Sequence, residues 1–468
     1  MTASFSILFI TVALMVLPGA VFADEADEVI RAWMAERQIP GAALIIVKRG
    51  KILKAANYGY ADTEARRPVA DTTVFEIASM TKQFTAAAVL LLAEEGKLKL
   101  DDPVSKHLSD VPAGWRDITV RRLLDHTSGL YDDWDENNEY FQSKNSDQEF
   151  LEALKISKLK FAPGERHAYS CGPFIAGMII AKLSGMPYSE FMRKRIFQPL
   201  GMLSTFVNGS GPAIKDAAIG YVLRDGKLQR GVQMSRTAHA RADVGISTTA
   251  RDLVKWLEAH HDARLLKDGS LREIFSFAKL NDGSTVPSGL GWWLNPIRGR
   301  PLRHHGGAFR SGFNSTINWY PKSDLAVILL ANRFRSSAND MGHVIAGVYD
   351  PIYRTTSSRK VISDPKPART KRLYEMLSQL SEGKLDLPPA APVFPYRYYE
   401  LTDWLDLLEG ADGMKFLGCD NIFGRGDRIF GKRIKEICFY RMNGKDSRPV
   451  SFLLDLKGKA LYTEPYEY

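Results

Sequence analysis

The sequence contains little cysteine and has no cluster of metal-ligating residues. Among its 468 residues there are three cysteines, Cys171, Cys419 and Cys438. That number is too small for a disulfide framework, so stability must come mainly from a hydrophobic core. Cys419 and Cys438 could form one bridge in an oxidising compartment or stay reduced in the core. The cysteine, histidine and acidic residues do not occur at the spacing of a metal site, so we expect no metal and no organic cofactor.

The charged residues also lack any concentrated tract. The formal net charge is +9, but the lysines and arginines are scattered and are not interleaved with aromatic residues in one segment. This pattern gives no support to nucleic-acid binding. A content of 45% hydrophobic and 25% charged residues is typical of globular proteins, and the length favours one large domain plus a smaller unit.

Only the N-terminus carries a long apolar run. Residues 5–17 are apolar, and Ala23 and Val21 occupy the last and third-last positions before Asp24. The run is shorter than the roughly 18 to 20 residues that a bilayer span needs. We therefore expect a signal peptide over residues 1–23, cleaved after Ala23, and a periplasmic or secreted mature protein without a transmembrane span. An uncleaved N-terminal anchor is the alternative, because the segment lacks lysine and arginine.

Strand patterns occur near both ends of a largely helical region. Residues 42–47 and 51–60 read as a β-hairpin, and residues 315–320 and 325–330 as two late strands around a Pro-Lys-Ser-Asp turn. Helices are expected at 27–37, 81–95, 148–155, 174–183, 188–196 and 250–259. The pattern predicts an α/β fold: one antiparallel sheet, closed by distant parts of the chain and flanked by helices, with an all-α lobe.

A composition change divides the chain near residue 355. Residues 355–368 are rich in Ser, Thr, Lys and Pro and are expected to be a linker after a main domain of 24–354. A helix at 369–380 and short strands at 429–430, 437–441 and 450–454 follow. They predict a small α+β accessory domain over 369–468.

The strongest chemical pattern is Ser79-Met80-Thr81-Lys82, at the start of an alanine-rich helix. Residues at i and i+3 lie on the same face of a helix, so the Lys82 amine can approach the Ser79 hydroxyl. The start of a helix also stabilises negative charge. A serine hydroxyl is a weak nucleophile until a nearby base removes its proton. Alone, however, the S-x-x-K pattern is common by chance.

The surrounding segments make the pattern specific. From about residue 27 to 350 the chain closely resembles the serine β-lactamase-related family, which includes class C β-lactamases, D-alanyl-D-alanine carboxypeptidases, D-aminopeptidases and certain esterases. The resemblance rests on a series of segments in the expected order: 75–82 (FEIASMTK), 95–104 (EGKLKLDDPV), 118–130 (ITVRRLLDHTSGL), 161–165 (FAPGE), 199–202 (PLGM), 245–253 (GISTTARDL) and 289–293 (GLGWW).

This resemblance implies a β-lactamase/transpeptidase-like fold and an acyl-enzyme on Ser79. Lys82 and Tyr169, the tyrosine of the family's Y-x-N element, would complete the proton relay. Free lysine and tyrosine both titrate near about 10, so either needs a lowered pKa to act as the base near neutrality. Which of the two is the base stays open. His126 is interpreted as structural, at a helix end where Gly129 takes a left-handed turn.

The family's third element is a strand with K-T-G or H-x-G, and here the segment is 303–308 (RHHGGA). Either His305-Gly306-Gly307 or His304-His305-Gly306 could be the motif, and the spacing to Gly312 favours the first. In that register the backbone N–H groups of Ser79 and Ala308 would form the oxyanion hole; in the other register, Gly307 would replace Ala308. The second histidine would be a surface residue of the strand.

Two departures from the family pattern bear on the substrate. Cys171 stands where the family has Asn, and a thiol donates and accepts hydrogen bonds only weakly. Histidine replaces the strand lysine, which removes a positive charge that would meet a substrate carboxylate; Arg310 could supply it instead. Cys171 itself is an alternative nucleophile, although no base in the motif is dedicated to it.

We therefore expect an exported esterase or D-amino-acid peptide or amide hydrolase. The substrate would be a small molecule or a peptide. The alternatives are a weak β-lactamase or D,D-carboxypeptidase, and a non-catalytic descendant that binds peptidoglycan or a partner. The sequence does not set the oligomeric state.

Overall fold

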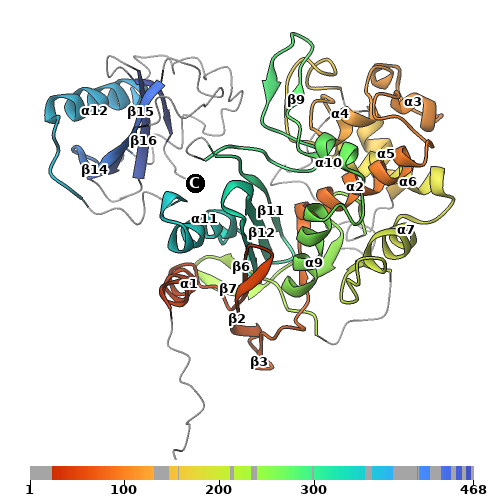
Figure 1. Ribbon diagram of the computed structural model, residues 1–468, viewed down its shortest axis with the longest axis horizontal. Helices are drawn as coiled ribbons and strands as arrows, with labels where there is room; N and C mark the ends of the chain where they lie inside the picture. Colours follow the sequence, from red (N-terminus) through yellow and green to blue (C-terminus); the bar gives the residue numbers. More distant parts are fainter. Residues whose placement is uncertain are drawn as a thin grey trace, which may run out of the picture.

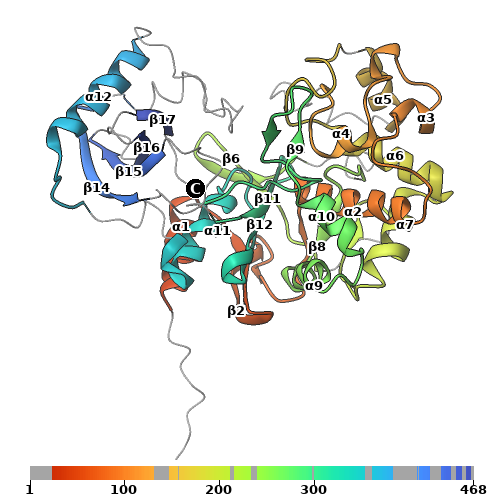
Figure 2. The ribbon, with the colours of Figure 1, turned by 45° about the horizontal axis from the view of Figure 1, so that its top comes forward.

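The computed structural model describes two folded units (Figure 1). The described residues are 24–130, 147–156, 158–210, 216–232, 240–297, 300–353, 361–382, 408, 410–421, 434–443, 449–455 and 460–464. The predicted signal peptide, residues 1–23, lies outside them. In both views the unit formed by α12 (Pro367–Ser381) and the last strands lies to one side of the main sheet, and the helical lobe lies on the other side (Figures 1 and 2).

The main sheet is antiparallel and joins the two ends of the first unit. Its strand order is β11-β12-β13-β1-β2-β3. β1 pairs with β13 from Ala42 opposite Ala331 to Lys48 opposite Leu325, so strands almost 300 residues apart are neighbours. This confirms the predicted closure of the sheet by distant segments. The strands are β1 (Gly41–Lys48), β2 (Lys51–Asp62), β3 (Arg67–Pro68), β11 (Arg303–Phe309), β12 (Phe313–Tyr320) and β13 (Leu325–Ala331).

Side-chain alternation along β1 gives the sheet two buried faces. Leu44 and Ile46 pack in a core with α1 (Glu25–Glu36) and α11 (Ala338–Tyr349). Ala43 and Ile45 point the other way, into the large core that contains the helical lobe. Strands that are buried on both faces read as continuous apolar runs, which is why β13 is apolar throughout and β1 is apolar as far as its last residue, Lys48.

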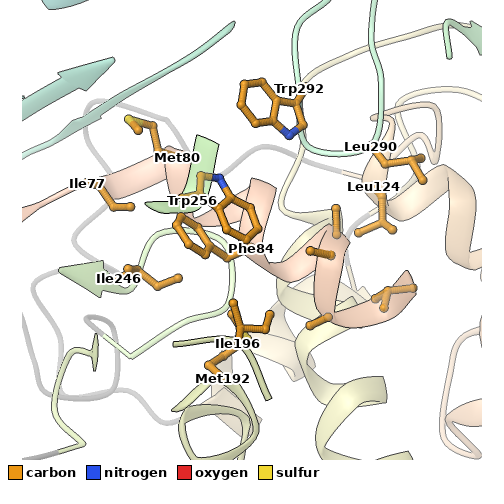
Figure 3. Packing of buried hydrophobic residues seen from close by; sticks show 14 of the residues in the cluster. Ile77, Met80, Phe84, Leu124, Met192, Ile196, Ile246, Trp256, Leu290 and Trp292 are labelled. Atoms are coloured by element: carbon orange, nitrogen blue, oxygen red, sulfur yellow. The ribbon is translucent and has the colours of Figure 1, made fainter. Parts of the chain in front are cut away.

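The helical lobe is built around α2 (Thr81–Glu94), which is buried along most of its length. Phe84 on α2 stacks on Trp256 of α9 at a ring-centroid distance of 3.9 Å, among apolar side chains from several elements (Figure 3). No helix in the described part of the chain combines the length and the apolar character needed to cross a bilayer. The remaining helices are α3 (Val104–His107), α4 (Val120–Leu124), α5 (Asp147–Ile156), α6 (Gly172–Ser184), α7 (Tyr188–Met192) with the π-helix Arg193–Phe197, α9 (Ala250–His261) and α10 (Asp268–Ile274).

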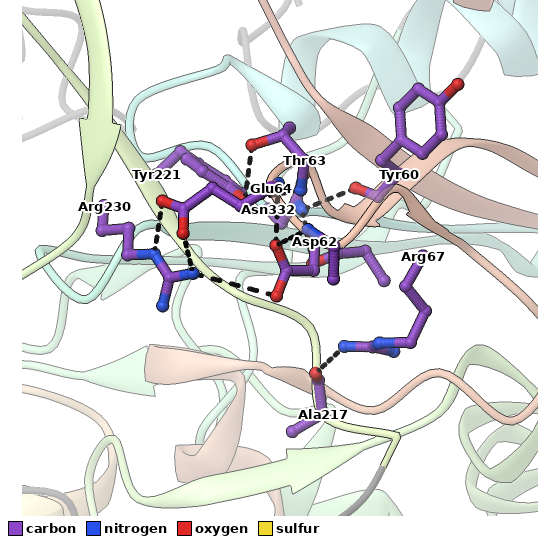
Figure 4. A network of polar contacts seen from close by, with 11 residues as sticks. Tyr60, Asp62, Thr63, Glu64, Arg67, Ala217, Tyr221, Arg230 and Asn332 are labelled. Carbon is purple, nitrogen blue, oxygen red and sulfur yellow. Dashed lines mark hydrogen bonds and ion pairs between the residues drawn. The ribbon is translucent and has the colours of Figure 1, made fainter.

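Several short strands were not predicted from the sequence because they are too brief to show periodicity. β4 (Phe75–Glu76), β8 (Ile246–Thr248) and β5 (Phe206–Val207) form a three-stranded sheet beside the start of α2. The hairpin of β6 (Tyr221–Arg224) and β7 (Lys227–Arg230) is tied to the end of β2 by polar contacts: the Tyr221 hydroxyl accepts from the Thr63 N–H at 2.8 Å, and Arg230 pairs with Glu64 at 2.7 Å (Figure 4). A further short hairpin is β9 (Ala278–Lys279) with β10 (Thr285–Val286).

The second unit has its own core. Leu373 and Leu377 of α12 pack on apolar residues of a four-stranded sheet in the order β14-β15-β16-β17. Cys419 and Cys438 face each other on adjacent strands and form a disulfide. The predicted strand at 429–430 lies outside the described residues, as do residues 355–360 of the predicted linker. The strands are β14 (Met414–Asn421), β15 (Ile434–Met442), β16 (Pro449–Asp455) and β17 (Ala460–Glu464).

Candidate active site

Ser79 lies in a single 3-10 turn, Ala78–Met80, between strand β4 and helix α2. The chain reaches it through Ala78, whose φ of +47° is unusual for a residue with a side chain. The Ile77 N–H donates to the Ile246 carbonyl of β8 at 3.0 Å, which attaches this turn to the three-stranded sheet. Ser79 is buried, with 5% of its surface exposed. The hydroxyl therefore sits at a fixed place at the entrance to α2.

Lys82 occupies the first turn of α2, where the sequence spacing placed it. Its Nζ lies 3.3 Å from the Ser79 Oγ and 2.9 Å from the backbone carbonyl oxygen of Asp243. The residue is only 2% exposed. A buried amino group requires hydrogen-bond partners, and these two oxygens supply them. The expected approach of amine to hydroxyl is present in the structure.

Tyr169 comes from the segment just before α6 and completes the group. The Lys82 Nζ lies 4.8 Å from the centre of its ring. The Tyr169 ring is half-buried and stacks with the Trp293 ring, at a centroid distance of 5.9 Å and an interplanar angle of 19°. The fold thus brings the three residues of the predicted relay together from two separate parts of the chain, the start of α2 and the segment before α6.

His126 packs directly against Tyr169. The ring centroids are 4.5 Å apart, and the His126 Nδ1 accepts a hydrogen bond from the Ser170 N–H at 3.2 Å. Burial is the largest cause that holds the pKa of His126 well below its ordinary value, and interactions with His167, Lys82 and His305 lower it further. The ring is therefore neutral. Because the His126 ring packs on the Tyr169 ring, it helps to orient Tyr169 in addition to its structural role after α4.

The local backbone around His126 differs from the sequence expectation in one respect. Helix α4 already ends at Leu124, and His126 itself has a φ of +62°. Gly129 has the expected left-handed φ of +77°. A Cβ there would lie 2.2 Å from the Phe161 carbonyl oxygen, so the close approach of the two segments also requires glycine.

Strand β11 presents its two histidines to opposite sides of the sheet. His305 faces the site, where its ring centroid lies 6.3 Å from that of Tyr169. His304 points toward α11, where its Nδ1 lies 3.3 Å from the Asn339 Oδ1. It is buried, so the expectation that the second histidine would be a surface residue is wrong: α11 covers this face of the strand. The structure thus places His305, and not His304, beside the predicted relay. Burial is the largest cause that lowers the pKa of His305 to about 3, so its ring is uncharged at neutral pH.

Gly307 lies on the same side of β11 as His305 and touches the turn that carries Ser79. A Cβ at Gly307 would lie 2.1 Å from the Ile77 carbonyl oxygen. At Gly306, on the opposite side, the nearest atoms to a Cβ would be 3.5 Å away or more. Only the absence of a side chain at Gly307 allows the strand and the Ser79 turn to pack this closely.

The backbone alternation of β11 also fixes the direction of Ala308. The His304 N–H donates to the Trp293 carbonyl at 2.9 Å, away from β12. Backbone groups alternate in direction along a strand, so Ala308, four residues further on, has its N–H on the same outer edge. β11 packs against the Ser79 turn along this part of its length. This direction is the one that the predicted oxyanion donor requires.

The other candidate residues occupy less prominent places. Cys171 is 1% exposed and lies in the main hydrophobic core at the N-terminus of α6. Arg310 follows β11, and its backbone carbonyl accepts from the Val232 N–H at 3.0 Å. Within the described ranges the one group with metal-ligating spacing is Cys419, Glu436 and Cys438, and its two sulfur atoms are joined as the disulfide.

Sequence reasoning missed three contributors to the site. The Asp243 carbonyl is a backbone group, so the residue type at this position does not predict its role. Trp293 belongs to a recognised segment, but nothing in that segment shows that its ring stacks on Tyr169. His167 lies 5.9 Å from His126 between ring centroids, and burial lowers its pKa to about 3. Its position two residues before Tyr169 was the available signal.

The same arrangement of segments is found in known proteins. A sequence profile of the beta-lactamase family matches residues 26–349. Penicillin-binding protein 4* of Bacillus subtilis is 29% identical over a match of 356 residues, and the match covers 71% of this chain and 78% of that protein. The structure of a D-amino acid amidase from Ochrobactrum anthropi is 26% identical with a TM-score of 0.62, and the match covers 70% of this chain and 99% of that one.

A third similarity extends into the second unit. An octameric penicillin-binding protein homologue from Pyrococcus abyssi matches 92% of this chain and 96% of its own, with a TM-score of 0.61 and 21% identity, a level that speaks for the fold alone. The matched profile covers well over half of the residues and includes Ser79, Lys82, Tyr169 and His305. The chain therefore belongs to the beta-lactamase family of serine hydrolases and has the β-lactamase/transpeptidase-like fold.

Proposed function

We propose that this protein hydrolyses esters or D-amino-acid amides through an acyl-enzyme on Ser79. The observation that carries the proposal is the 3.3 Å separation of the Lys82 Nζ from the Ser79 Oγ inside a buried site that also contains Tyr169. A nucleophile next to a basic group that other residues orient is the arrangement of covalent catalysis.

The reaction follows from this arrangement. The Ser79 Oγ attacks the substrate carbonyl carbon, and its proton passes to Lys82 or Tyr169. The N–H groups of Ser79 and Ala308 stabilise the oxyanion, a contribution of about 3 kcal/mol for each donor. The relay returns the proton to the leaving alcohol or amine as the bond to the carbonyl carbon breaks. Water then attacks the acyl-enzyme by the same steps in reverse and releases the acid.

The neutral histidines of the site favour substrates that have no carboxylate near the bond that is broken. His305 stands where a lysine would give a permanent positive charge, and its lowered pKa, about 3, leaves it neutral. His126 is neutral as well. A substrate carboxylate would be desolvated here without a cation from β11, which is costly. The amidase similarity at 26% identity favours the same substrate class.

A substrate panel tests the proposal. Purified mature protein is incubated with nitrophenyl acetate, D-phenylalanine amide, a D-alanyl-D-alanine peptide and nitrocefin, and Ser79 labelling by a fluorophosphonate is followed by mass spectrometry. We expect turnover of the first two substrates and labelling that Ser79→Ala abolishes. Faster turnover of the peptide or of nitrocefin would favour a carboxypeptidase or a β-lactamase. Absence of both turnover and labelling would favour a binding protein derived from the fold.

We also propose that the protein is exported after cleavage behind Ala23. The disulfide between Cys419 and Cys438 fits an oxidising compartment. Asp24, the first residue after the expected cleavage, caps α1 by accepting from the Asp27 N–H at 3.1 Å. N-terminal sequencing of the protein recovered from a bacterial periplasm or medium should begin at Asp24. A product retaining residues 1–23 in the membrane fraction would support the uncleaved anchor.

A further inference from the structure

A short turn brings a backbone carbonyl to the amine of Lys82. Asp243 lies in the turn, and its carbonyl oxygen is 2.9 Å from the Lys82 Nζ. The N–H groups of Val244 and Gly245 both donate to the Arg241 carbonyl, at 3.2 and 2.7 Å, so the chain folds back on itself around Asp243. The direction of this carbonyl therefore depends on how the turn is held.

A buried ion pair holds the turn from inside. The Arg241 Nε and Nη2 donate to the two carboxylate oxygens of Asp243 at 3.0 and 2.8 Å. The two side chains are only 2% and 4% exposed. The guanidinium also lies 3.8 Å from the ring centre of Phe150 and 5.2 Å from that of Phe174. A two-point contact between planar groups fixes orientation as well as distance. Rotation of Asp243 would leave a buried charge without its partner.

The turn is also attached to the helix that carries Lys82. The Thr85 hydroxyl, one turn along α2, donates to the Ala242 carbonyl at 2.5 Å. On the other side of the turn, the Ile246 N–H donates to the Thr81 Oγ1 at 3.0 Å. The turn and the first turn of α2 thus form one connected unit.

We propose that the Arg241–Asp243 ion pair is a positioning device for the Lys82 amine, acting through the Asp243 carbonyl. The inference rests on the proposed function and adds residues that do not touch the substrate. A buried ion pair is poor evidence of a stabilising role, because well-packed apolar replacements are often as stable or more stable. The ion pair includes the side chain of the residue whose backbone carbonyl binds Lys82, which provides another reason for a buried ion pair here.

The test separates stability from position. Asp243→Asn breaks the pair but leaves Arg241 buried, so it can destabilise the protein. The double variant Arg241→Met with Asp243→Leu removes both charges and fills the space. A control double variant, Arg369→Met with Glu436→Leu, removes a partly buried pair in the other folded unit, whose atoms are 2.8 Å apart and whose side chains are 6% and 18% exposed. For each protein we would measure the melting temperature, kcat and KM for a nitrophenyl ester, and the rate of Ser79 labelling by a fluorophosphonate.

A fourth measurement does not depend on catalysis. The rate at which a small amine-directed reagent modifies Lys82, read by mass spectrometry, reports how firmly that amine is held. We expect the double variant to fold, to lose about 10- to 100-fold in kcat and labelling rate with KM changed less than about twofold, and to modify Lys82 faster. The control should match the wild type in all rates.

Two results would overturn the proposal: a double variant that acylates as fast as the wild type, or one whose Lys82 is modified at the wild-type rate. If Asp243→Asn fails to fold, the double variant still decides. If the wild type itself shows no labelling at Ser79, the proposed function fails, and the modification rate of Lys82 still tests the positioning role.

Discussion

Replacing Gly307 by alanine tests whether contact between β11 and the Ser79 turn sets the geometry of the site. The added Cβ would lie 2.1 Å from the Ile77 carbonyl oxygen and 2.6 Å from the Ser315 Oγ. Ordinary contacts of this kind are more than 3 Å, so the strand and the turn must separate by about 1 Å. Backbone atoms cannot rotate away as a flexible side chain could.

The expected loss follows from that displacement. A shift of about 1 Å in a catalytic group costs on the order of 100-fold in rate. Both Ser79 and the Ala308 N–H lie beside the contact, so acylation should fall by about that factor in Gly307→Ala. The measurement is the second-order rate of fluorophosphonate labelling at Ser79, with the melting temperature recorded on the same samples.

The neighbouring glycine provides a matched control. A Cβ at Gly306 would have its nearest neighbours at 3.5 and 3.6 Å, which is ordinary van der Waals contact. We expect Gly306→Ala to label Ser79 within about twofold of the wild-type rate. Equal losses in the two variants, or an unaffected Gly307→Ala, would refute the reasoning, because the two substitutions differ only in the face of the strand on which the methyl lies.

Three further predictions concern stability. Burial is the largest cause that lowers the pKa of His260 to about 4. Below about pH 6.5 the unfolded chain therefore binds a proton at this residue that the folded chain does not bind, and the free energy of unfolding falls as the pH falls. In urea titrations the free energy of unfolding of His260→Phe should fall by about 2 kcal/mol less than that of the wild type between about pH 7 and about pH 5. Replacing both Cys419 and Cys438 by alanine should cost the second unit about 2 to 4 kcal/mol in calorimetry and leave Ser79 labelling unchanged; a slower labelling rate would contradict the independence of the two units. Gly129→Ala, at a φ of +77°, should cost more than about 1 kcal/mol in the same titrations, and an unchanged midpoint would argue against the close approach to the next segment.

Those parts of the site that follow from local rules were predictable from the sequence. The approach of Lys82 to Ser79 follows from helical spacing, although Ser79 itself lies in the 3-10 turn that leads into α2. The shared sheet follows from the occurrence of strand patterns at both ends of the domain. The choice between His304 and His305 needed more, because a shift of one residue sends every side chain of a strand to the other face. That choice is settled by the contact of Gly307 with Ile77, which joins residues 230 positions apart.

The contacts that orient Tyr169 could not be inferred for a related reason. Three aromatic rings stack in space, those of His126, Tyr169 and Trp293, but the residues are separated by 43 and 124 positions in the sequence. No sequence motif around one of them predicts contact with the others. The contact of the Asp243 carbonyl with Lys82 is still harder to predict from the sequence, since every residue has a backbone carbonyl. Sequence patterns identify which side chains can react, whereas the groups that aim them come from tertiary packing.

The backbone around the nucleophile shows how that packing acts. Ala78 holds a φ of +47°, a conformation that costs an L-residue roughly 1 to 2 kcal/mol and that glycine would adopt freely. Yet its methyl group is buried against Val244 and Phe309. Glycine would relieve the strain, but it would leave that space unfilled and make the backbone before Ser79 more flexible. An unfavourable conformation survives only where surrounding contacts outweigh it. The packing of the Ala78 methyl group therefore holds the backbone that leads into Ser79 in a conformation that local preference alone would not select.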